Sequence, residues 1–117
     1  MQLIPIVTAF ALLLSGTGVF AAPNSARIAE TGAHLLGNAH RCGVADDRVV
    51  RAGRVIRKLI VAASDDANEQ VAAKSRFAEI FRASARPDGE GHAPIPCKTV
   101  MTQFERLEQF QQQTGMR

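Results

Sequence analysis

Residues 46–64 read DDRVVRAGRVIRKLIVAAS, and the spacing of their apolar side chains decides the fold class. The residues expected to face inward recur at intervals of three and four: Val49, Gly53, Ile56, Leu59, Ile60 and Ala63. This is the period of an amphipathic α-helix, whereas a half-buried strand alternates at every second residue. Asp46 or Asp47 begins the helix, where a carboxylate lies at the positive end of the helix dipole. Because Gly53 costs up to ~1 kcal/mol of helix propensity relative to alanine, we expect a neighbouring helix to approach closely there.

Three further segments have the same helical period, and none alternates with a period of two. The first is expected to run from Ser25, as its N-cap, to about His40, with Gly43 just beyond its end. Another follows the turn at residues 64–66 and stops at residues 86–87, where Arg-Pro ends the pattern. These boundaries place short turns between the first three helices.

The last helix begins near Pro96 or Cys97, since proline is favoured in a first turn, and it can end at Gly115. One side of it carries an apolar stripe: Val100, Met101, Phe104, Leu107 and Phe110. Only the connector before it, residues 86–96 (RPDGEGHAPIP), is longer than a helix–helix turn requires. The sequence therefore predicts an all-α, up-down-up-down four-helix bundle.

The N-terminus has the layout of a secretory signal peptide. The first 22 residues contain no charged side chain, and an apolar run over residues 4–14 leads into small residues and then Val19-Phe20-Ala21. We expect cleavage after Ala21, which makes residues 1–21 the signal peptide and leaves residues 22–117 as one helical domain in the periplasm or the extracellular space. No Lys or Arg precedes the apolar run, which is atypical of a signal peptide. Retention of this segment as an anchor is the alternative, although about 20 apolar residues are needed to cross a bilayer.

The two cysteines fit the predicted topology as a disulfide. Cys42 follows the first helix and Cys97 begins the last, and an up-down-up-down bundle places these two ends at the same pole. Exported chains with two cysteines usually oxidise them. A bridge across 55 residues removes unfolded-state entropy worth roughly 4 kcal/mol in the chain-entropy model.

A metal site is the alternative interpretation of the same pole. His40, Cys42, His92 and Cys97 supply the ligand types of a Cys₂His₂ zinc site, although their spacing is not that of a structural zinc motif. His40 and His92 could also bind a metal or a small ligand without the thiols. There is no C-x-x-C or C-x-x-C-H, so we expect neither thiol–disulfide chemistry nor covalent haem, and no cofactor.

Four cations form a strip on the helix at residues 46–64: Arg51, Arg54, Arg57 and Lys58. At 100° per residue they lie opposite Val49, Ile56 and Ile60. This basic strip is either the solvated face of an amphipathic helix or a surface that binds anions. The formal net charge of +3 permits both interpretations. We do not expect nucleic-acid binding, because no aromatic residue interleaves the cations and no nucleic-acid motif is present.

No catalytic constellation is evident, and we do not expect an enzyme. Ser64, Ser75 and Ser84 lack a G-x-S-x-G setting, and residues 88–91 (DGEG) lack the ligand pattern of a calcium loop. The apolar last helix and the long connector favour a protein that binds another envelope or extracellular protein, as an adaptor, a chaperone-like factor or an inhibitor. The alternatives are ligand binding at the histidine pole and attachment of the basic strip to an anionic membrane surface.

Overall fold

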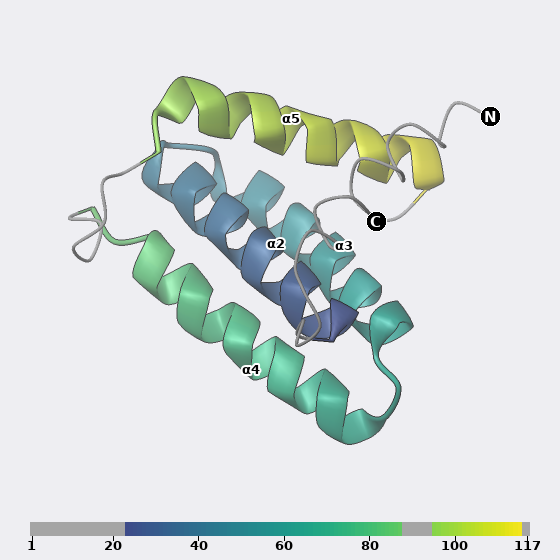
Figure 1. The fold of residues 1–117 in the computed structure, drawn as a ribbon. Coiled ribbons are helices and arrows are strands. Elements are labelled where there is room, and N and C mark those ends of the chain that lie inside the picture. The colour runs from purple at the N-terminus through teal and green to yellow at the C-terminus, as the bar shows by residue number, and fades with distance from the viewer. Residues whose placement is uncertain (1–22, 88–94, 116–117) are drawn as a thin grey trace.

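The computed structural model describes residues 23–87 and 95–115, and four α-helices make up most of them (Figure 1). Each has 18 residues: α2 (Asn24–Arg41), α3 (Asp46–Ala63), α4 (Ala67–Ser84) and α5 (Cys97–Thr114). Successive helices run in opposite directions, which confirms the predicted all-α, up-down-up-down bundle. The expected signal peptide (1–21) and residues 88–94 lie outside the described residues. Among the described helices, none is long and apolar enough to span a membrane.

The helix ends follow local sequence signals. The Oδ1 atom of Asp66 accepts a hydrogen bond of 2.8 Å from the backbone N–H of Glu69, which caps α4. Gly43 and Gly115 follow α2 and α5 with φ of +93° and +71°, a conformation that glycine adopts without steric cost. Pro96 directly precedes α5, as predicted.

Ser25 is not the cap that the sequence predicted. The N-cap position of α2 is Pro23, without a side-chain hydrogen bond, and the helix begins at Asn24. Ser25 is therefore inside the first turn and fully buried, and its hydroxyl donates a 2.7 Å hydrogen bond to Glu69 of α4. Its role is to join two helices, because a polar group that is buried needs a hydrogen-bond partner.

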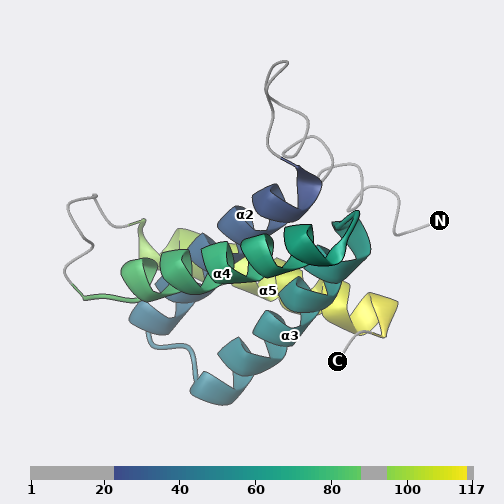
Figure 2. The same cartoon turned by 90° about the horizontal axis from the view of Figure 1, so that it is seen from below.

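The first helix of the bundle, α2, contacts all three others and packs most extensively on α4, which runs beside it in the same direction (Figures 1 and 2). Small buried side chains recur every four residues along α2: Ser25, Ala29, Ala33 and Gly37. A Cβ atom on Gly37 would lie 2.9 Å from the carbonyl oxygen of Phe81 and closer still to the Cβ of Ser84. The row of small residues therefore allows the two helices to approach closely.

The expectation of a close approach at Gly53 is wrong. A Cβ atom there would meet only the Cδ1 atom of Leu36, at 3.8 Å, which is ordinary van der Waals contact. The close approaches are made by α2, at Gly37 and at Gly32, where a Cβ atom would lie 2.8 Å from the Cγ2 atom of Ile56. The physical reason is that α2, rather than α3, occupies the centre of the bundle.

Alanine at Gly53 and at Gly37 should have opposite effects. Gly53→Ala has room for its methyl group and should raise the free energy of unfolding by up to ~1 kcal/mol, the difference in helix propensity. The methyl group of Gly37→Ala must push α4 away. This substitution should lower the free energy of unfolding by about 1–2 kcal/mol, because the strain of overpacking exceeds the gain in helix propensity. Urea unfolding of the two variants beside the parent measures both changes; a stabilised Gly37→Ala would show that α2 and α4 are further apart.

The core lies along α2, where α3, α4 and α5 pack against it. Its largest fully buried apolar side chains are Phe104, Leu36, Ile60, Val55 and Val100. Val100 and Phe104 are the buried residues of α5, and Met101 and Leu107 pack half-buried against the core. Four of the five residues of the apolar stripe predicted for the last helix therefore lie in the core or against it, and Phe110 is half-buried.

Candidate binding surface on helix α3

The end of α2 and the start of α5 meet at one pole of the bundle, where Cys42 and Cys97 form a disulfide with their Cα atoms 5.6 Å apart. This confirms the predicted pairing. Beside the bridge, the guanidinium of Arg41 donates hydrogen bonds of 2.9 Å to the carbonyl oxygen of Ile95 and to Oδ1 of Asn38. Because both sulfur atoms are in the bridge, a zinc site that uses these cysteines is excluded.

Of the two candidate metal ligands, His40 is exposed at this pole and His92 lies outside the described residues. The Nδ1 atom of His40 is 3.4 Å from Oδ1 of Asp46, and its ring centroid is 6.2 Å from that of Phe81. Over residues 23–87 and 95–115, no three His, Cys, Asp or Glu side chains cluster as a metal site would require. Metal binding by His40 and His92 stays a prediction.

A contact between a serine and a histidine was not foreseen from the sequence. The Nδ1 atom of His34 lies 3.1 Å from the Oγ atom of Ser84, which links α2 to α4. A hydroxyl beside an imidazole is one element of nucleophilic catalysis, which also needs a third group that orients the base. The two residues are 50 positions apart, so only the packing of α4 on α2 could reveal the pair.

The orientation of α3 is set by its buried side, which faces the core: Val49, Ala52, Gly53, Val55, Ile56 and Ile60. The opposite side is exposed and is called here the outer face of α3: Val50, Arg51, Arg54, Arg57, Lys58 and Val61. All four members of the predicted basic strip thus lie on the surface. Val50 and Val61, which are 50% and 43% exposed, lie toward the two ends of the face.

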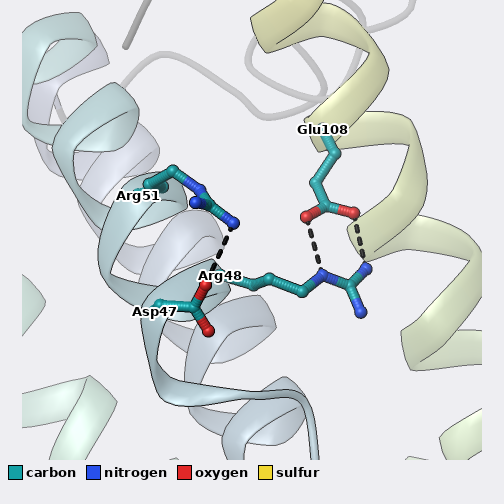
Figure 3. A network of polar contacts seen from close by, with 4 residues as sticks. All are labelled: Asp47, Arg48, Arg51 and Glu108. Carbon is teal, nitrogen blue, oxygen red and sulfur yellow. Dashed lines mark hydrogen bonds and ion pairs between the residues drawn. The ribbon is translucent and has the colours of Figure 1, made fainter.

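Two arginines of the outer face are available to a ligand. The Nη2 atom of Arg51 is 3.3 Å from Oδ2 of Asp47, one turn earlier on the same helix (Figure 3). Neither Arg54 nor Arg57 has an ion-pair or hydrogen-bond partner for its side chain within residues 23–87 and 95–115. Because Arg54 and Arg57 are one turn apart, their guanidinium groups can reach the same ligand.

The remaining arginine of α3 is directed away from the outer face. Arg48 makes a two-pronged ion pair with Glu108 of α5, with N–O distances of 2.6 and 3.0 Å (Figure 3). Its guanidinium carbon lies 5.3 Å from the centroid of the Phe104 ring, within cation–π range. The hydrogen bonds that Arg48 donates to the Glu108 carboxylate raise the pKa of Arg48 above its usual value. Arg48 thus connects α3 to α5 and is not part of the basic strip.

The net charge of the chain lies entirely on α3. This helix has five cations and two carboxylates, whereas the rest of the chain has nine of each, so the formal net charge of +3 equals that of α3 alone. Four of the five cations of α3 lie on the outer face, and neither of its two carboxylates belongs to that face. The outer face of α3 is therefore a positive surface.

Comparison with known proteins assigns neither a family nor a function. The chain matches no protein-family model, no curated protein sequence and no solved structure.

Proposed function

We propose that the chain is an exported binding protein that attaches to a negatively charged partner through the outer face of α3. The observation that supports this is the row of four cations on one exposed face of α3, the helix whose formal charge equals that of the whole chain, with Arg54 and Arg57 unpaired among the described residues. A guanidinium group is a planar fork that matches the oxygen atoms of a carboxylate or a phosphate. Folding does not account for the arrangement, because exposed charges without partners contribute little to stability.

The basic strip replaces the surface that the sequence first suggested for partner binding. The apolar stripe of α5 is used in the core, and most of the 86–96 connector lies outside the described residues. An acidic envelope or extracellular protein and an anionic membrane surface both have the charge that the outer face of α3 requires. Action by binding rather than by catalysis is part of the proposal, and no catalytic step is assigned to His34 and Ser84.

Export is supported by the Cys42–Cys97 bridge, because structural disulfides belong to proteins of oxidising compartments. We expect the protein recovered from the periplasm or the medium to have an intact mass that begins at Ala22 and is two protons lighter than the dithiol form. A full-length chain with free thiols, recovered from the cytoplasm, would contradict export.

Binding through α3 can be tested on immobilised polyglutamate and polyphosphate. We expect the protein to be retained at low salt, and Arg54→Gln/Arg57→Gln to elute at clearly lower salt. The matched control is Lys74→Gln/Lys98→Gln, which removes two exposed cations from α4 and α5. This variant therefore has the same net charge as Arg54→Gln/Arg57→Gln. If the two double variants elute together, retention reflects net charge alone and the proposal fails.

A further inference from the structure

We propose that the partner of the outer face of α3 is the anionic phospholipid surface of a membrane, to which the bundle attaches peripherally. This inference rests on the proposed function and specifies its partner. Three features support it: the shape of the face, its chemistry, and the formal charge of the rest of the sequence.

The shape of the face suits a flat partner. Val50 and Val61 are eleven residues apart, which corresponds to about 16 Å along a helix, and the four cations lie between them on the same side. The helix is on the outside of the bundle, where α2 is its main neighbour (Figure 2). A plane can touch all six side chains of one helix face at once, whereas a protein partner must offer a groove that accepts the helix.

The chemistry of the face favours phosphate headgroups over a protein interface. Protein interfaces are enriched in aromatic anchors that fill pockets, but this chain contains no Trp or Tyr and the apolar members of the face are two valines. Arg54 and Arg57 can each bind a phosphate through two hydrogen bonds. Because the apolar side of α3 is buried in the core, the helix cannot insert as an amphipathic anchor does. The valines reach only the headgroup level, so the attachment is electrostatic and reversible.

The charge distribution orients the molecule on such a surface. Outside α3 the cations and carboxylates of the chain balance, so an anionic plane attracts the α3 side and has no net attraction for the remainder. Next to the face, Asp47 is paired with Arg51, which reduces the repulsion of Asp47 by an anionic surface. The bundle therefore approaches a membrane with α3 first.

The test is co-sedimentation of the oxidised protein with phosphatidylcholine vesicles in which phosphatidylglycerol makes up none or a third of the lipid. We expect binding only to the anionic vesicles, and loss of binding at high salt. Arg54→Gln/Arg57→Gln should lower the partition coefficient by about 30-fold, which corresponds to about 1 kcal/mol for each cation near an anionic surface at about 1.4 kcal/mol per factor of ten. Lys74→Gln/Lys98→Gln should change it by no more than about twofold, since surface potentials fall off within a Debye length. All variants share one N-terminus, so a difference between them reports on α3, and unchanged thermal unfolding confirms that they are folded.

The outcomes separate this inference from the proposed function. Retention on polyglutamate without binding to anionic vesicles would overturn the lipid assignment and leave an acidic protein as the partner. Equal vesicle binding by the two double variants would also overturn it, because attachment would not depend on the outer face of α3. If the protein binds neither vesicles nor polyanions, both the inference and the proposed function fail.

Discussion

Replacing Phe104 with alanine is expected to lower the free energy of unfolding by about 3–5 kcal/mol, as for other buried phenylalanines. The side chain is fully buried and is one of the two residues of α5 that are buried in the core. Its loss leaves a cavity between α5 and the helices α2 and α3. It also removes the aromatic ring over which the Arg48 guanidinium lies. Equilibrium unfolding in urea, followed by circular dichroism, measures the change.

The control for this substitution is Phe110→Ala, six residues further along the same helix. Phe110 is half-buried, so its truncation should cost clearly less than that of Phe104. Equal losses at the two positions would mean that α5 does not dock through Phe104 as described.

Removal of the disulfide is the second large effect. Cys42→Ser/Cys97→Ser should lower the free energy of unfolding by roughly 4 kcal/mol. This is the contribution of the unfolded-chain entropy that a bridge across 55 residues removes and that the double variant regains. Cys97 is exposed and Cys42 half-buried, so the introduced serines remain in contact with water and add little penalty of their own. The measurement is urea unfolding of the double variant beside the oxidised parent protein.

Reductant provides an internal control for the disulfide. It should destabilise the parent protein by about the same amount and leave the double serine variant unchanged. A parent protein whose unfolding is insensitive to reductant would contradict a stabilising role for the bridge.

Much of the fold could be predicted because its signals are local. The carboxylates in the first turn of α3, the proline before α5 and the glycines after α2 and α5 mark helix ends by their own type and position in the sequence. The disulfide could be predicted because alternating helices bring residues 42 and 97 to the same pole. The position of α2 could not be predicted in this way. It depends on the row of small residues, whose role is visible only once α4 is packed against α2. The same contact buries Ser25, which donates a hydrogen bond to α4 instead of capping α2.

Part of the candidate site could likewise be predicted from local signals, and part depends on contacts between distant segments. The basic strip follows from the helical period, because burying Val49, Ile56 and Ile60 directs the opposite side of α3 outward. The separation of Arg48 from the strip depends on Glu108, which is 60 residues away and reaches Arg48 only because α5 folds over α3. The contact between His34 and Ser84 is of the same kind, since two segments distant in the sequence must first be packed.

The central position of α2 has a consequence for the order in which the chain can fold. Of the four helices, α2 is synthesised first, but the hydrogen-bond partners of its side chains are synthesised much later. The partner of Ser25 is a carboxylate 44 residues downstream, and that of His34 is a hydroxyl 50 residues downstream. A nascent chain that has only its first helix therefore has nothing against which to bury the row of small residues, and isolated helices of this length are marginal in water. Folding before most of the polypeptide has been synthesised is therefore disfavoured, and this agrees with the proposed export, in which the chain would cross the membrane unfolded.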